Sequence, residues 1–182
     1  MATKRKNEVI TVIGAGLAGC EAAWQAAQAG VRVRLLEMKP KRYTPAHTLP
    51  HFAELVCSNS LRAAAITNAV GLLKEEMRQL NSLIMQAADT HQVPAGGALA
   101  VDREGYAQAV TDAIKNHPLI EVVTEKVMSI PEDGIVIVAT GPLTDGKLAE
   151  SIAAFSGEDY FHFFDAAAPI VYLESLNQDI VY

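Results

Sequence analysis

Three glycines and one acidic residue near the amino terminus have the types and the spacing that dinucleotide binding requires. The glycines lie in the turn 14–19, between the apolar run 9–13 and a segment of helical composition. A second apolar run, 31–36, ends at Glu37. Strand, glycine turn, helix, strand and acid follow one another in this order in dinucleotide-binding units. The glycine motif alone is weak evidence, and its context makes the prediction of a dinucleotide site specific.

Each glycine of this turn has a separate predicted role. Gly14 permits the tight turn, Gly16 lets backbone N–H groups approach a pyrophosphate, and Gly19 lets the helix pack closely on the strand. The amino end of the helix offers the phosphates unpaired N–H groups and a positive dipole. Glu37 follows Gly19 at nearly the roughly 20-residue spacing expected of an acceptor for a ribose 2′-hydroxyl. An acid at this position favours FAD or NAD over NADP.

Cys57 is the candidate for nucleophilic chemistry. It follows apolar residues and precedes the polar run 58–60, with Arg62 close behind. A helix amino terminus or a guanidinium favours the thiolate, so this thiol could be reactive, although a buried structural cysteine fits the sequence equally well. Cys20, inside the expected first helix, is better explained as a packing residue. Two cysteines do not make a disulfide framework.

Composition and charge narrow the class of protein. Half of the 182 residues are apolar and a fifth are charged, which predicts a soluble globular protein with a real core. The net charge of −6 gives no overall basic field for nucleic acid, and the positive residues at 4–6 and 39–42 are expected to be a solvated tail and a polar loop. Without an apolar run of about 20 residues or a secretory signal, a cytoplasmic protein with no membrane contact is expected. His47 and His51 lack a third ligand, so no metal site is predicted.

The rest of the chain predicts alternating helices and strands, and therefore an α/β fold with a parallel sheet. The expected helices are 17–29, a single amphipathic helix 69–88 with a buried apolar stripe, and 103–116. The expected later strands are 98–101, two short strands at 119–124 and 126–130 that could form one hairpin, and the fully buried parallel strand 135–139. The composition changes after Gly157. We therefore expect a Rossmann-like dinucleotide-binding domain over residues 1–150 and the start of a second, substrate-side domain over 151–182.

Five segments in one order carry a resemblance to a known family. They are residues 14–24, 55–62, 94–103, 139–144 and 165–171. Together they resemble the TrmFO family of folate- and FAD-dependent tRNA uracil-5-methyltransferases, from Val9 to the end of the chain. The sequence is more distantly similar to the GidA/MnmG flavoproteins, which share the glycine turn. Members of the TrmFO family continue well past residue 182, so the resemblance implies a truncated chain.

The resemblance implies a fold of the GidA and glutathione-reductase type, and a reaction. The family converts the T-loop uridine of tRNA to ribothymidine, with carbon from 5,10-methylenetetrahydrofolate and electrons from reduced FAD, which NAD(P)H recharges. Cys57 matches a cysteine proposed to act at the family's site, and our hypothesis is that it acts on the uracil. The residues implied to bind FAD are Gly14, Ala15, Gly16, Leu17, Ala18, Gly19, Glu37, Thr140 and Gly141.

Two other functions remain compatible with the sequence. One is an FAD-dependent oxidoreductase that does not act on tRNA; a second G-x-G-x-x-G motif for NADH would favour it, and the sequence has none. The other is a non-catalytic FAD-binding fragment that partners a missing half.

Overall fold

The strands predicted around the glycine turn lie in one parallel sheet. The computed structural model describes residues 9–157 and residue 177. Its four-stranded sheet has the order β6-β2-β1-β7, and every neighbouring pair is parallel. The strands are β1 (Val9–Ile13), β2 (Arg32–Glu37), β6 (Ile120–Thr124) and β7 (Ile135–Val138). The predicted α/β fold with a parallel sheet is confirmed.

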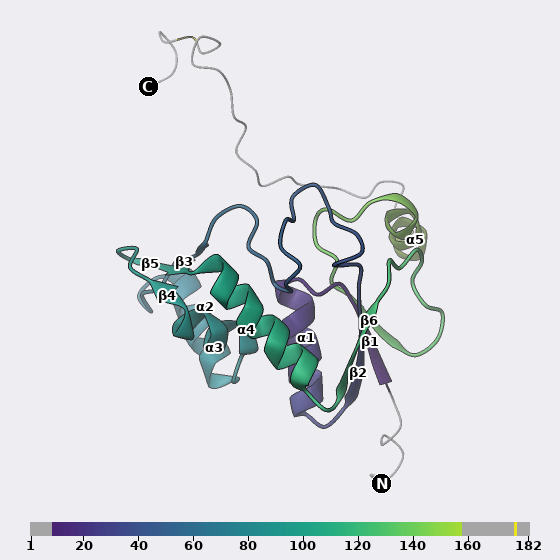
Figure 1. Cartoon of the computed structure of the whole chain (residues 1–182), viewed down its shortest axis with the longest axis horizontal. Coiled ribbons are helices and arrows are strands. Elements are labelled where there is room, and N and C mark those ends of the chain that lie inside the picture. Colours follow the sequence, from purple (N-terminus) through teal and green to yellow (C-terminus); the bar gives the residue numbers. More distant parts are fainter. Residues whose placement is uncertain (1–8, 158–176, 178–182) are drawn as a thin grey trace.

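The helices are α1 (Leu17–Gln28), α2 (Ala69–Gln79), α3 (Leu83–Thr90), α4 (Arg103–Asn116) and α5 (Gly146–Ser156). Helices α1, α3 and α4 pack against one face of this sheet, with a smaller antiparallel sheet beyond them, and α5 lies on the other face (Figure 1). The smaller sheet has the order β3-β5-β4, with β3 (Ser60–Ala63), β4 (Gln92–Val93) and β5 (Ala98–Val101). The glycine turn joins β1 to α1, and therefore lies at the carboxyl edge of the parallel sheet.

Small side chains let α1 lie close to the strands. Cys20, Ala23 and Ala27 form its buried face, and they share the main core with side chains of β1, β2, α3 and α4. On the other face of the sheet, Leu148 of α5 packs against Ile13 and Leu36. The sheet is thus covered on both faces near the turn, as parallel sheets require.

The single helix predicted over residues 69–88 is wrong, because two helices occupy this segment. The backbone reverses at Asn81, which has a left-handed φ of 55°. Ser82 then caps α3, its Oγ accepting from the N–H of Met85 at 3.2 Å. The predicted buried stripe is correspondingly split: Ile84 is buried, whereas Leu80 is 69% exposed. Asn81 and Ser82 are residue types that favour turns, but the prediction followed the apolar periodicity and ignored them.

Of the two short strands expected at 119–124 and 126–130, only the first forms, so the possible hairpin is absent from this described segment. This strand, β6, pairs in parallel with β2, Leu35 lying opposite Val122. The second segment has no strand partner; instead the N–H of Ile130 donates to Ser151 of α5 at 3.0 Å. Parallel strands need a crossover connection, and the chain between β2 and β6, which ends in α4, supplies it.

The strand predicted at 135–139 is parallel but not fully buried. β7 forms an edge of the sheet among the described residues, and Ile135 is 53% exposed there. The predicted boundary after residue 150 falls inside α5, and most of the predicted second domain lies outside the described residues, so the domain division stays a prediction. Within the described segments, no helix is long and apolar enough to cross a membrane.

Candidate dinucleotide site and cysteine pocket

The glycine turn is packed between the carboxyl ends of three strands. The N–H of Gly14 donates to Leu36 of β2 at 2.8 Å, and the N–H of Ala139, just after β7, donates to Ile13 of β1 at 2.8 Å. Gly14 has a φ of 96°, and a Cβ there would lie 2.7 Å from the Ala139 oxygen. A Cβ on Gly19 would lie only 1.8 Å from the Gly14 oxygen. Both positions therefore exclude any side chain.

Gly16 differs from the other two glycines of the turn. A Cβ there would meet only the Ala139 oxygen, at 4.0 Å, so the protein itself leaves the space beside Gly16 open. Gly16 is also the N-cap of α1, with no side chain to accept from the N–H groups of the first helical turn. An uncapped helix amino terminus beside open space is a suitable site for an anionic group.

Glu37 lies directly against the glycine turn. It is buried at the end of β2, and its Oε2 accepts from the N–H of Ala15 at 2.7 Å. Its Oε1 accepts from the N–H of Lys39 at 2.9 Å. A carboxylate has about four acceptor positions, so these two bonds leave Glu37 able to accept from a hydroxyl. The structure thus brings the predicted acid and the predicted turn together.

Thr140 and Gly141 form a second turn beside the first. A Cβ on Gly14 would lie 3.0 Å from the Cα of Thr140, which shows how closely the two turns approach. The Thr140 hydroxyl lies 2.6 Å from that of Thr144, and the Thr144 hydroxyl donates to the Gly141 oxygen at 2.7 Å. All predicted FAD-binding residues therefore gather at one edge of the sheet.

Cys57 is exposed, which excludes the alternative of a buried structural cysteine. It lines an open pocket of about 360 Å³ that also includes Leu17, the first residue of α1. We call this the cysteine pocket; its lining residues are Leu17, Glu54, Leu55, Val56, Cys57, Ser58, Ser60, Leu61 and Arg62. The cysteine pocket therefore adjoins the glycine turn at Leu17.

Cys20 has the packing role predicted for it. Its side chain is fully buried, and its Sγ donates to the Ala15 oxygen at 3.3 Å. Burial is the main reason that the pKa of this thiol is raised far above its ordinary value, with the charge of Glu37 acting in the same direction. Cys20 is therefore held as a neutral thiol that supports the turn.

The loop between β2 and β3 is held by a buried ion pair that the sequence analysis missed. Lys39 was expected to be solvated, yet its side chain is 6% exposed and that of Glu54 is 2% exposed, with 3.5 Å between Nζ and Oε2. Lys39 also donates to the backbone oxygens of Leu49 and His51. The sequence could not predict this ion pair, because Lys39 and Glu54 are far apart in the loop and only its folding brings them together.

Glu54 and the backbone fix the end of this loop beside the glycine turn. The Oε1 of Glu54 accepts from the N–H groups of Thr48 and Leu49, at 2.9 and 3.1 Å. The N–H of Ala53 donates to the Ala15 oxygen at 2.9 Å. The segment that leads to Cys57 is thus tied both to the loop and to the turn.

Replacing Glu54 with glutamine is expected to destabilise the fold and to change its pH dependence. Burial alone would raise the pKa of Glu54, but the N–H groups of Thr48 and Leu49 and the charge of Lys39 outweigh it, so the pKa lies below its ordinary value. The carboxylate therefore stabilises the fold fully above the unfolded pKa of about 4.3, and this contribution is lost as pH falls through the lowered folded value.

At pH 7 the Glu54→Gln variant leaves Lys39 buried without a counter-charge, which should cost about 3 kcal/mol in free energy of unfolding. Urea denaturation at pH 7 and at pH 4 measures both effects, and the difference between variant and parent should shrink at the lower pH. Glu76→Gln, at an exposed position of α2, is the matched control and should change neither value. Equal stability of Glu54→Gln and parent at pH 7 would contradict the role of the pair.

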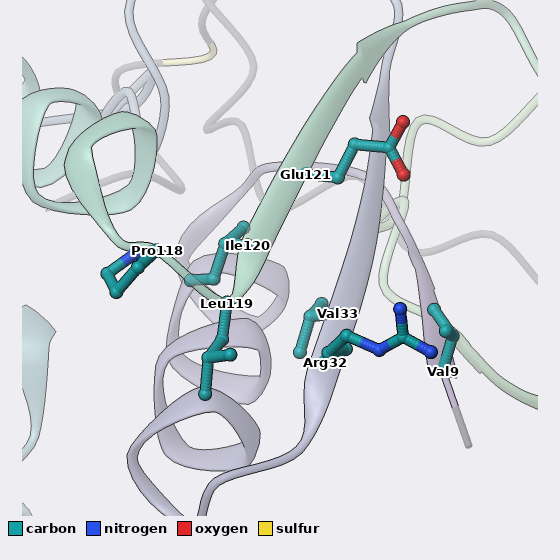
Figure 2. Close-up of a pocket in the computed structure, with 7 residues that line it drawn as sticks. All are labelled: Val9, Arg32, Val33, Pro118, Leu119, Ile120 and Glu121. Carbon is teal, nitrogen blue, oxygen red and sulfur yellow. The ribbon is translucent and has the colours of Figure 1, made fainter. Parts of the chain in front are cut away.

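A second cavity lies at the opposite edge of the parallel sheet. Its volume is about 220 Å³, and its lining residues include Val9, Arg32, Pro118 and Glu121 (Figure 2). These residues lie at or near the amino ends of β1, β2 and β6. Because parallel sheets bind ligands at the carboxyl ends of their strands, we assign the candidate site to the cysteine pocket and the glycine turn instead.

The parallel sheet, the glycine turn and the acid against it define the Rossmann-like class of dinucleotide-binding domains. The family model described as glucose inhibited division protein A (GIDA) matches residues 9–182, and the chain belongs to this family. The solved structure of GidA from Aquifex aeolicus has the same fold over 68% of this chain and 20% of its own length, with a TM-score of 0.54 and 18% identity.

Much more similar relatives carry the name methylenetetrahydrofolate–tRNA-(uracil-5-)-methyltransferase TrmFO. The relative from Desulforamulus reducens is 64% identical over 173 residues, which is 95% of this chain and 39% of the relative. The relative from Lactococcus lactis is 62% identical over 177 residues, 97% of this chain and 40% of the relative. The resemblance seen in the sequence is confirmed, and the chain spans about 40% of the length of these relatives.

Proposed function

We propose that this chain is the FAD-binding and cysteine-bearing part of a folate- and FAD-dependent tRNA uracil-5-methyltransferase that acts in the cytoplasm. The names of the relatives support this activity, and the observation that carries it is the cysteine pocket, which joins Leu17 of the glycine turn to Cys57. A reaction that combines a nucleophilic thiol with a flavin needs these two elements in one cavity.

The residues at the sheet edge fit FAD. In this proposal the turn 14–19 binds the pyrophosphate, Glu37 accepts from the ribose, and Thr140 and Gly141 contact the flavin side. The open space beside Gly16 supports this arrangement, as do the free acceptor positions of Glu37. When bound, FAD would supply the hydride that completes the methyl group, after reduction by NAD(P)H.

Cys57 would act on the uracil. Uracil C5 is a poor nucleophile, but a thiolate that bonds to C6 moves the electron pair of the C5–C6 double bond into an enolate. C5 then bonds to the methylene carbon of 5,10-methylenetetrahydrofolate. Loss of the C5 proton and of the folate amine leaves an exocyclic methylene, and hydride addition there expels the thiolate and restores the ring double bond. Cys57 thus returns unchanged.

The division of the chain follows from the same proposal. Residues 1–150 would form the FAD-binding domain, and residues 151–182 would begin the domain that contributes to substrate binding. The T-arm of tRNA and the folate would then bind at the cysteine pocket.

Isotope transfer tests the proposed reaction. Because the chain spans about 40% of its relatives, activity is measured on a family-length hybrid, in which residues 9–182 replace the matching segment of the Desulforamulus reducens relative. The hybrid receives tRNA with labelled 5,10-methylenetetrahydrofolate or with labelled S-adenosylmethionine. We expect label in ribothymidine from the folate alone. Transfer from S-adenosylmethionine, or NAD(P)H oxidation without any transfer, would reject the proposal. Flavin absorption of the 182-residue protein reports whether this part binds FAD by itself.

A further inference from the structure

Strand β3 contains an irregularity directly beside Cys57. It pairs with β5 at Ser60–Ala100 and at Ala63–Ala98, and the register shifts between these two pairs. Leu61 and Arg62 therefore lie opposite one residue of β5, which is the pattern of a β-bulge. Bulges redirect side chains and are common next to active sites.

Arg62, within the bulge, has an unusual backbone conformation. Its φ is 68°, in the left-handed region that residues other than glycine adopt at a cost. The surrounding contacts hold it there: its N–H donates to the Ser60 Oγ at 3.0 Å, and the Asn59 side chain donates to the Val101 oxygen at 3.1 Å. Strained residues of this kind concentrate at sites that bind ligands.

The charge of Arg62 is not neutralised by any acid in the described part of the chain. Its side chain is exposed and lines the cysteine pocket, and none of the ion pairs among these residues includes it. The carboxylate of Glu54, which lines the same pocket, is occupied by Lys39 and by the loop N–H groups. The nearby charge is instead positive: after burial and Arg78, Arg62 contributes to lowering the pKa of Lys74.

We propose that Arg62 is a substrate-binding residue of the cysteine pocket, whose guanidinium pairs with an oxyanion of the substrate. The inference rests on the proposed function, in which the oxyanion is either a phosphate of the RNA or a carboxylate of the folate. A guanidinium fits both groups with two parallel hydrogen bonds, which an ammonium cannot reproduce. The bulge directs this group into the pocket, and the absence of an acidic partner among the described residues leaves its donors available.

Binding measurements on the FAD-loaded hybrid test the proposal. The dissociation constants of a T-arm RNA hairpin and of tetrahydrofolate are compared for the parent, Arg62→Gln and Arg62→Lys. We expect Arg62→Gln to weaken one of the two by about 10-fold or more, since a charged hydrogen bond is removed, and Arg62→Lys to weaken it less. A change for RNA identifies a phosphate, and a change for folate identifies a carboxylate.

Two further variants separate binding from structure. Arg34→Gln removes an exposed arginine of β2 that lies outside the cysteine pocket, and it should leave both constants unchanged. Arg62→Gly relieves the left-handed strain, so it should lose binding while its thermal midpoint stays equal or rises. Unchanged binding in Arg62→Gln, or a fall in flavin content that matches the fall in binding, would overturn the proposal. Isotope transfer is measured separately, so a hybrid that binds through Arg62 but transfers no label rejects only the proposed reaction.

Discussion

The Cys57→Ala variant of the family-length hybrid is expected to retain FAD and its thermal midpoint while losing methyl transfer to below about a thousandth of the parent rate. The thiol is exposed, so its removal should cost the fold little. No other thiol of the described residues can replace it. Cys20 is buried, donates to Ala15, and has its pKa raised mainly by burial.

Three measurements make this prediction specific. Isotope transfer from labelled 5,10-methylenetetrahydrofolate reports the reaction, flavin absorption reports FAD, and thermal denaturation reports the fold. Cys57→Ser should be nearly as inactive as Cys57→Ala, because a hydroxyl is a much weaker nucleophile than a thiolate. Cys20→Ala should keep the reaction. Methyl transfer by Cys57→Ala at the parent rate would exclude Cys57 as the nucleophile.

The Gly19→Ala variant is expected to lose FAD and about 3 kcal/mol of stability. Its Cβ would lie 1.8 Å from the Gly14 oxygen, and both atoms belong to the backbone framework, so no side-chain rotation relieves the clash. Helix α1 would have to move away from β1, and the pyrophosphate site would move with it. Urea denaturation and flavin absorption of the purified protein measure the two losses.

Gly16→Ala is the matched variant in the same turn. Its Cβ would meet only one protein atom, at 4.0 Å, so its stability should equal that of the parent. FAD binding should still weaken, because the added methyl group occupies the open space that the pyrophosphate is proposed to use. If Gly16→Ala binds FAD normally, the pyrophosphate does not lie there. If Gly19→Ala is as stable as the parent, the described packing of α1 on the turn is wrong.

The parts of the site predicted from the sequence are those set by local chemistry. The glycine turn and Glu37 belong to neighbouring elements, so the order of strand, turn, helix and strand is enough to predict that they approach each other. The bond from Ala15 to Glu37 is the outcome of that order. The same locality made the position of Cys20 predictable, since a small residue within the first helix faces the sheet.

The missed parts depend on contacts between distant segments. Lys39 and Glu54 meet only when the loop between β2 and β3 folds back on itself, so the sequence showed Lys39 as one of several loop cations. The sequence left a hairpin open for the segment of β6 because its true partner, β2, lies more than eighty residues earlier in the chain. The exposure of Cys57 likewise depends on how the loop is anchored. Its apolar neighbours in the sequence had kept a buried position open.

The backbone hydrogen bond from the Ala53 N–H to the Ala15 oxygen limits how far Cys57 can move relative to the glycine turn. It joins the segment just before Cys57 to the turn between β1 and α1. The two sides of the candidate site are therefore held together directly, although a long irregular loop separates them in the sequence. A mutation that shifts this turn is therefore expected to shift the segment that leads to Cys57. In the proposed reaction, this backbone bond and the contacts of Glu54 would together fix Cys57 relative to the turn that is proposed to bind FAD.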